Sequence, residues 1–189
     1  MAIETEKKFR LEPKQYTKIA SRLKKLGADF RDEVFEENYL HRGGVLDARG
    51  AVLRLRKTNG KTTLTYKEAI PGSNSHVKQK IEFETEVANV DETEQIIGAL
   101  GYRLSIIYEK RRKTFHLDDV EIVLDELPFG LYMEIEGTHK AIARAERRIG
   151  IKSLKPEIRG YPRLTIKFGK LRGSVMEARF KKPRKTVKV

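Results

Sequence analysis

The sequence has no cysteine and no tryptophan among its 189 residues. The missing cysteines exclude disulfides, thiolate metal ligands and thiol nucleophiles. No run of residues approaches the roughly 18 apolar positions that a membrane-spanning helix needs, and the N-terminus lacks the pattern of a signal peptide. We therefore expect a cytoplasmic protein that makes no contact with a membrane.

Familiar catalytic patterns are also missing. The sequence has neither a G-x-x-x-x-G-K-S/T phosphate loop nor a G-x-G-x-x-G turn, and no serine stands in a recognisable nucleophile context. The histidines are dispersed without metal-ligand spacing, which argues against zinc; they are His41, His76, His116 and His139. These chemistries are therefore disfavoured, whereas charged residues make up 35% of the chain, well above the typical value of about a quarter.

The net charge of +13 is unevenly distributed along the chain. Residues 169–189 hold eight lysines and arginines and one acid, Glu177, a net charge of +7, so residues 1–168 hold the remaining +6. A basic terminal segment is usually solvated and sometimes contacts polyanions. We expect residues 1–168 to form one domain and residues 169–189 to form a flexible tail with weak affinity for polyanions.

Local signals predict a protein rich in β-strands with a few helices. Two alternating runs joined at Asn59-Gly60 indicate a hairpin. Asp91, with Glu94 three residues later, is typical of a helix start. The expected strands are 2–10, 34–41, 51–58, 61–69, 78–88, 105–116, 120–126 and 131–137; the expected helices are 13–26, 91–100 and 138–150, with a loop at 70–77 and a short element at 161–168.

Three of the predicted strands carry a Glu-x-Glu pair. Alternate residues of a strand point to the same face, so each pair places two carboxylates together: Glu4 with Glu6, Glu82 with Glu84, and Glu134 with Glu136. The stretch IETEKKF at 3–9 is also echoed by IEFETEV at 81–87, either by internal duplication or by chance. Two related β-rich halves favour a closed antiparallel sheet, because closure removes exposed edges.

Basic residues follow the same alternation on other strands, and the opposite face is usually apolar. The ordinary interpretation is that the charged face meets water and the apolar face meets the core. If instead the sheet closes with its charged face inward, it encloses a tunnel with a carboxylate patch and a basic patch. Such a tunnel suits a polyanion with a divalent metal, since Mg²⁺ and Mn²⁺ take carboxylate and phosphate oxygens and Arg and Lys neutralise phosphate.

These residues resemble a known family. Glu4-x-Glu6-x-Lys8 is similar to the signature of the CYTH superfamily, or triphosphate tunnel metalloenzymes, which groups class IV adenylyl cyclases with thiamine and inorganic triphosphatases. The likeness continues through VLRLRK, LTYKEA, KQKIEFETEV, YEKRRKTF, VLDELPFGLYMEIEG and GYPRL. It spans residues 1–168.

The resemblance implies an α+β fold, a closed eight-stranded antiparallel β-barrel with flanking helices that binds a triphosphate and Mg²⁺ or Mn²⁺. By position it implies metal binding by Glu4, Glu6, Glu82, Glu84, Glu134 and Glu136. It implies triphosphate binding by Lys8, Arg54, Arg56, Lys80, Lys110, Arg112 and Arg163. It implies catalytic roles for Asp125 and for a Tyr39/Lys67 pair linked to water activation.

Two departures from the family pattern matter. Lys80 stands where arginine is more usual, which loses bidentate phosphate binding, and the His-Phe pair found in some cyclases is missing. We also expect the neighbours of Lys67 to be the cations Arg54, Arg56 and Lys80, which would favour a neutral amine able to take a proton from water.

The sequence therefore favours metal-dependent hydrolysis of ATP, tripolyphosphate or thiamine triphosphate. A class IV adenylyl cyclase, which makes cyclic AMP and pyrophosphate from ATP, is the alternative. A non-catalytic module that binds polyphosphate or RNA is a third hypothesis, although it does not explain six paired glutamates. Assembly as a homodimer is left open.

Overall fold

The structure, a computed structural model, describes residues 2–70 and 77–181, and these form ten strands and five helices. The loop predicted at 70–77 lies almost entirely outside these residues. In chain order the elements are β1 (Ala2–Leu11), α1 (Pro13–Lys25), β2 (Asp29–Arg42), α2 (Gly44–Ala48), β3 (Val52–Thr58), β4 (Lys61–Ala69), β5 (Lys78–Glu86), α3 (Val90–Ala99), β6 (Arg103–Leu117), β7 (Val120–Leu127), β8 (Gly130–Glu136), α4 (His139–Ile149), α5 (Tyr161–Phe168), β9 (Lys170–Arg172) and β10 (Val175–Ala178).

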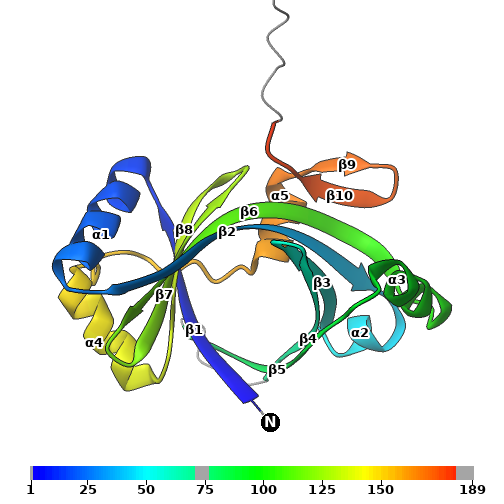
Figure 1. Cartoon of the computed structure of the whole chain (residues 1–189), viewed down its shortest axis with the longest axis horizontal. Coiled ribbons are helices and arrows are strands. Elements are labelled where there is room, and N and C mark those ends of the chain that lie inside the picture. Colours follow the sequence, from blue (N-terminus) through cyan, green and yellow to red (C-terminus); the bar gives the residue numbers. More distant parts are fainter. Residues whose placement is uncertain (1, 71–76, 182–189) are drawn as a thin grey trace, which may run out of the picture.

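Eight of the strands close into a ring. Their order is β2-β3-β4-β5-β1-β8-β7-β6, and β6 pairs with β2 to complete the circle. Every pairing in the ring is antiparallel. The ring is visible in Figure 1. The predicted closed eight-stranded antiparallel barrel with flanking helices is thus confirmed.

Most predicted elements lie close to their expected positions, and the exceptions have local causes. Asn59 and Gly60 both adopt positive φ, 47° and 81°, as a tight hairpin turn requires. Strand β2 is longer than predicted because its partner β6 pairs with it from Asp29 onward. The N-cap of α3 is Asn89, not Asp91: the Asn89 side chain accepts a hydrogen bond from the backbone of Glu92. Helix α2 was not predicted.

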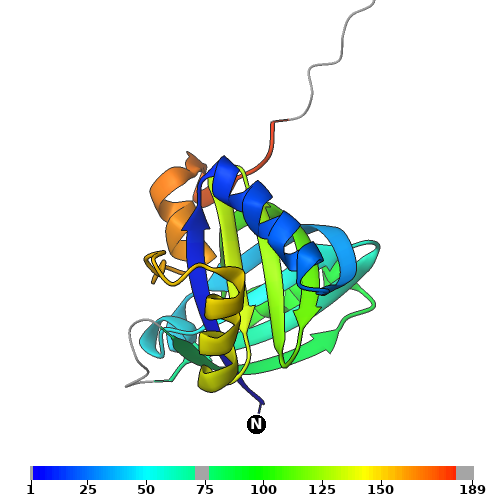
Figure 2. The ribbon, with the colours of Figure 1, turned by 90° about the vertical axis from the view of Figure 1, so that its left-hand side faces the viewer.

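The main hydrophobic core lies outside the barrel rather than within it. Helix α1 contributes Ile19 and Leu23, and α4 contributes Ile142 and Ile149, to a buried cluster with outward-facing residues of β1, β6, β7 and β8 such as Phe9. Figure 2 shows these two helices lying over the sheet. None of the described helices has the length and apolarity to cross a membrane. The helices therefore cover the apolar face, which leaves the charged face to line the interior.

A second cluster fills one end of the barrel. Inward-facing Leu40, Tyr108 and Tyr132 pack with Tyr161 and Leu164 of α5, and all five are almost fully buried. The Tyr132 and Tyr161 rings meet edge to face, 5.5 Å apart between centroids. Helix α5 thus closes the tunnel at this end.

The chain continues as part of the sheet beyond residue 168. Strand β10 pairs in parallel with β6 at residues 106–108, where β7, which pairs only with residues 111–117, leaves that side of β6 free. Arg179 then contacts Glu37 and Glu109 at 3.2 and 3.1 Å. Residues 170–178, which were expected to belong to a flexible tail, thus pair in the sheet, because an open strand edge favours pairing. Residues 182–189 lie outside the described part.

Candidate active site

The barrel encloses a cavity of about 540 Å³. Twenty of the described residues line it, and fifteen of these are charged. The carboxylates are Glu4, Glu6, Glu82, Glu84, Glu121, Glu134 and Glu136. The cations are Lys8, Arg54, Arg56, Lys67, Lys80, Lys110, Arg112 and Arg163. The structure therefore brings together all six predicted metal ligands and all seven predicted triphosphate-binding residues.

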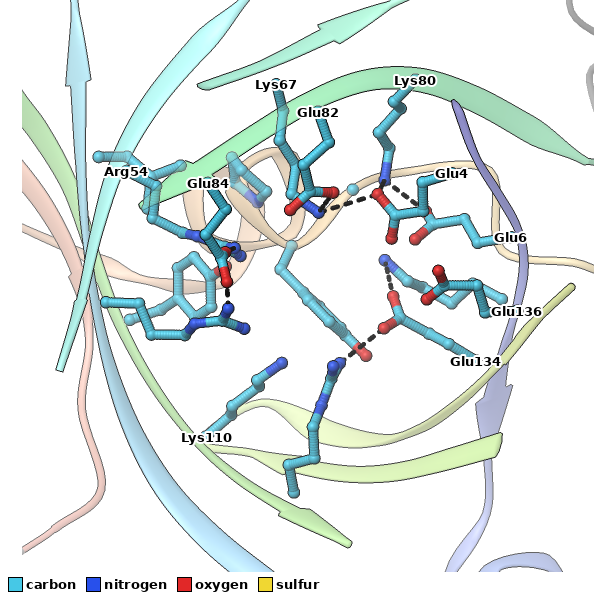
Figure 3. A pocket seen from close by; sticks show the side chains of 18 of the residues that line it. Glu4, Glu6, Arg54, Lys67, Lys80, Glu82, Glu84, Lys110, Glu134 and Glu136 are labelled. Carbon is cyan, nitrogen blue, oxygen red and sulfur yellow. Dashed lines mark hydrogen bonds and ion pairs between the residues drawn. The ribbon is translucent and has the colours of Figure 1, made fainter. Parts of the chain in front are cut away.

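The charges are sorted across the tunnel. Glu4, Glu6, Glu134 and Glu136 gather on one side, whereas Arg54 and Lys110 lie on the opposite side (Figure 3). We call these the carboxylate wall and the basic wall. The order of the strands produces the division, because β1 and β8 are neighbours in the ring, as are β2, β3 and β6.

Lysines offset part of the repulsion on the carboxylate wall. In the antiparallel register of β1 and β5, Glu4 lies opposite Lys80, and the Lys80 ammonium contacts Glu6 at 2.9 Å. Lys67 lies between Glu4, at 2.9 Å, and Glu82, at 2.5 Å. Two ammonium groups thus stand among three carboxylates.

These contacts change the proton affinities of the groups. Burial alone would raise the pKa of Glu4, but its hydrogen bond with Glu82 and the charges of Lys80 and Lys67 lower it to about 2. Burial and the neighbouring Glu4 raise the pKa of Glu82, its partner. Burial would lower the pKa of Lys80, yet Glu6 and Glu4 hold it above its ordinary value. Glu4 is therefore held in its charged form, whereas Glu82 binds a proton more readily than a free glutamate.

Glu136 is different. It makes no ion pair with any residue that the structure describes, and partial burial together with Glu4 and Glu121 raises its pKa to about 7. Glu121, directly opposite Glu136 in the pairing of β7 with β8, was not predicted as a site residue. The carboxylate wall thus has more negative charge than its lysines neutralise.

The donor set of this wall fits a hard divalent cation. Mg²⁺ and Mn²⁺ bind carboxylate oxygens, and such an ion would offset the charge that raises the pKa of Glu136. In the described residues no three such groups already converge at metal-binding distance. The ammonium groups of Lys67 and Lys80 occupy the space between Glu4, Glu6 and Glu82.

On the basic wall, buried carboxylates hold the cations. Asp125 is fully buried and binds the Arg112 guanidinium with both oxygens, at 2.8 and 2.7 Å. Tyr161 donates a hydrogen bond to Asp125 at 2.7 Å, and Arg112 also reaches Glu134 at 2.7 Å. Asp125 does not line the cavity. Its geometry is that of a residue that positions Arg112, not one that touches a substrate.

Glu36 is a second buried carboxylate of this wall, and it was missed in the sequence. It contacts Lys110 at 3.3 Å and Arg112 and Arg56 at 3.9 Å. Burial would raise the pKa of Glu36, but these cations outweigh burial and lower it to about 2. Burial and the charge of Arg112 lower the pKa of Lys110 to about 8, against the opposing effect of Asp125 and Glu36.

Two of the predicted metal ligands, Glu84 and Glu134, form ion pairs with basic residues. Glu84 accepts hydrogen bonds from Arg56 at 2.9 Å and from Thr65 at 2.8 Å. Glu134 contacts Lys8 at 2.9 Å, and the Lys8 ammonium also lies 3.7 Å from the centre of the Tyr161 ring. Glu84 therefore holds Arg56, and Glu134 joins the two walls.

The predicted Tyr39/Lys67 pair is not formed. Tyr39 lies on the outer face of β2, where its hydroxyl bonds Glu37 at 3.1 Å and its ring faces Arg179. Lys67 contacts carboxylates rather than the expected cluster of cations. Arg163 lines the cavity from the first turn of α5.

A family model described as the CYTH domain matches residues 2–161. The chain belongs to the CYTH family. Its members are generally enzymes, adenylyl cyclases and triphosphatases among them, that use divalent metals and act on triphosphates such as ATP. A curated Methanocaldococcus jannaschii protein named as a putative adenylate cyclase is 30% identical over 137 residues, which cover 71% of this chain and 76% of that protein.

Solved structures agree on the CYTH fold. The PH1012 protein of Pyrococcus horikoshii is 26% identical with a TM-score of 0.74, covering 85% of this chain and 98% of that one. A Hippeastrum protein described as a putative adenylyl cyclase that reveals a dominant triphosphatase activity has a TM-score of 0.64 at 19% identity, covering 83% of this chain and 91% of that one. At that identity the likeness is one of fold alone.

Proposed function

We propose that this CYTH protein hydrolyses a triphosphate, inorganic or organic, with Mg²⁺ or Mn²⁺. The observation that carries the proposal is the division of one cavity into a carboxylate wall and a basic wall. A triphosphate with a divalent cation has the complementary pattern, because its oxygens attract Arg and Lys while the cation attracts carboxylates.

Glu4, Glu6, Glu82 and Glu136 are the residues that would hold the metal. Their oxygens are the ligands that hard cations prefer, and Glu136 has no ion-pair partner in the described chain. When bound, the metal polarises a phosphoryl oxygen and neutralises charge on the phosphate. Lys67, which contacts Glu4 and Glu82, is placed to orient these carboxylates, and we assign it that role in place of a general base.

Lys8, Arg54, Arg56, Lys110 and Arg112 would bind the phosphate oxygens. Arg112 is fixed by two bonds to Asp125, so its donors are in place before the substrate arrives. Fixed donors stabilise charge that develops in the transition state without reorganising during the reaction. With water as the nucleophile, positioning and electrostatics supply most of the catalysis in phosphoryl transfer.

Cyclisation of ATP is the alternative reaction. The name of the Methanocaldococcus relative favours it. Tyr108 and Tyr161 line the α5 end of the cavity, but both are almost fully buried in the cluster that fills this end, so they leave little aromatic surface for adenine. The charge of nearly all other lining residues favours recognition of the triphosphate itself. A non-catalytic module that only binds polyanions is disfavoured, because the seven carboxylates among the described lining residues would repel a polyanion.

Product analysis distinguishes these reactions. The purified protein is incubated with ATP, tripolyphosphate or thiamine triphosphate and with Mg²⁺ or Mn²⁺, and every product is identified. Orthophosphate as the main product supports hydrolysis. Cyclic AMP and pyrophosphate in equal amounts, with negligible orthophosphate, would replace hydrolysis by cyclisation. The variant Arg56→Gln, purified identically, controls for contaminating phosphatases, because removal of a substrate-binding donor should lower genuine turnover about a hundredfold.

A further inference from the structure

A second cavity, of about 580 Å³, lies on the outside of the barrel where α1, α4 and residues 150–154 meet. Helices α1 and α4 can be followed in Figure 2. We call this cavity the outer groove. Its lining contains the cations Lys18, Arg22, Lys25, Arg147 and Arg148, and among the described residues it contains no carboxylate. The tunnel cavity, by contrast, combines cations and carboxylates in nearly equal numbers.

Three of the cations in the outer groove lie on one face of helix α1. Lys18, Arg22 and Lys25 are spaced by four and three residues, so they share one face of α1. Like charges at these spacings destabilise a helix, and α1 has no acidic residue to offset them. Arg147 adds a cation from α4, across the groove.

Helix stabilisation explains only part of this cluster. Arg22 donates from Nε to the carbonyl oxygen of Arg148 at 3.2 Å, and Arg148 pairs with Asp118. Cations in the last turn of a helix also interact favourably with its dipole. Lys18 lies well before the last turn of α1, however, and within the described residues no ion pair involves Lys18, Lys25 or Arg147.

We propose that the outer groove binds a compact, multiply charged phosphate anion, at a site separate from the tunnel. Its volume lies in the range of small-molecule sites. Its floor is formed by Ile19, Ile149 and Ile151, which are almost fully buried, so it offers little apolar surface to a peptide. Ser21 and Ser153 in the lining add hydroxyl donors for phosphate oxygens.

Calorimetric titration with tripolyphosphate, without divalent metal and at low salt, tests this site independently of any hydrolysis. The double variant Lys18→Gln/Lys25→Gln is compared with Lys14→Gln/Lys24→Gln, which removes the same charge from α1 outside the groove. Each lost charge-assisted bond corresponds to about a tenfold loss of affinity. We expect the first variant to lose one binding component and the control to keep it.

Three results would overturn the proposal. The first is that the tunnel variant Arg56→Gln binds no tripolyphosphate at all, since the groove, which this change leaves intact, would then bind nothing. Another is an equal loss in both lysine double variants, which would indicate a general charge effect. The third is that a single-stranded RNA 12-mer binds the groove with higher affinity than tripolyphosphate does. The ligand would then be an extended polyanion rather than a compact one.

Discussion

The carboxylates on the two walls of the tunnel differ in their ion-pair partners and in the direction in which their pKa values are shifted. On the basic wall, Glu36 and Asp125 are buried among guanidinium and ammonium groups, and the pKa of Glu36 is lowered to about 2. On the carboxylate wall, Glu136 has no such partner among the described residues, and its pKa is raised to about 7. The basic wall is thus neutralised by the protein itself, whereas the carboxylate wall is not.

This difference separates two functions. Cations that are held by buried carboxylates keep their geometry without a ligand, which is the condition for electrostatic preorganisation. Carboxylates with surplus negative charge are instead stabilised by the arrival of a cation. We infer that the basic wall has its final geometry in the protein alone, whereas the carboxylate wall needs a bound metal ion to balance its charge.

The largest expected effect comes from breaking the basic wall at Asp125. The change Asp125→Asn removes the carboxylate that holds Arg112 by two bonds and leaves Glu134 as its close partner. Breaking a fully buried ion pair costs about 3–5 kcal/mol of stability, and the remaining contact with Glu134 keeps the expected loss below that range. We expect at least a thousandfold loss of triphosphate turnover and a lower midpoint in urea unfolding.

Glu126→Gln is the matched control. Glu126 is the next residue on β7, where it meets the exposed Arg111 at 3.2 Å, and an exposed pair contributes about 1 kcal/mol or less. Its turnover and unfolding midpoint should stay close to those of the unchanged protein. Equal behaviour of the two variants would contradict the role given to Asp125.

A smaller effect is expected at Glu36. The change Glu36→Gln keeps the shape of the side chain but removes the charge beside Lys110 and Arg112. We expect turnover to fall about tenfold to a hundredfold, chiefly through kcat, because the donors are less well held in the transition state. A change confined to KM would indicate that Glu36 affects substrate binding only.

The smallest effect is expected at Tyr39, which lies on the outer face of β2, behind the basic wall. Because Tyr39 faces away from the cavity and toward Arg179, the change Tyr39→Phe should alter turnover less than about twofold. A loss within the roughly 10²–10⁴ range of general-base catalysis would restore the Tyr39/Lys67 pair and contradict the observed geometry.

Tyr39 also shows where the sequence was ambiguous. Strands with a clear alternation, such as Glu4-x-Glu6-x-Lys8, predicted correctly which side chains share a face. Within the predicted strand 34–41 each face carries one glutamate and two apolar or aromatic residues: Glu36 with Val34 and Leu40, and Glu37 with Phe35 and Tyr39. Periodicity could not choose between them, so Glu36 was missed and Tyr39 was assigned to the wrong side.

Other features had no local signal at all. Alternation along a strand is the same whether the charged face points inward or outward, and only the placement of α1 and α4 on the apolar face decides. Strand β10 has four residues and depends on a free stretch of β6 that is distant in the sequence. Such long-range pairing is set by tertiary structure rather than by propensity.

The most direct test of the difference between the walls is the thermal stability of the protein and of Glu136→Gln, measured from pH 4 to pH 9 with and without Mn²⁺. Since the pKa of Glu136 rises from 4.5 to about 7 on folding, the folded state binds more protons in that window. The contribution of Glu136 to stability without metal, measured as the difference between the protein and Glu136→Gln, should therefore fall as pH rises through the window and stay low above it.

Without metal at pH 8, Glu136→Gln should be the more stable protein, because it lacks this charge, and the two should match at pH 4. Saturating Mn²⁺ at pH 8 should raise the Tm of the unchanged protein by several degrees, since a ligand at a hundred times its Kd adds about 2.7 kcal/mol, and should raise the Tm of the variant much less. Equal stability at pH 8 without metal, together with an equal response to Mn²⁺, would contradict a carboxylate wall that awaits its metal.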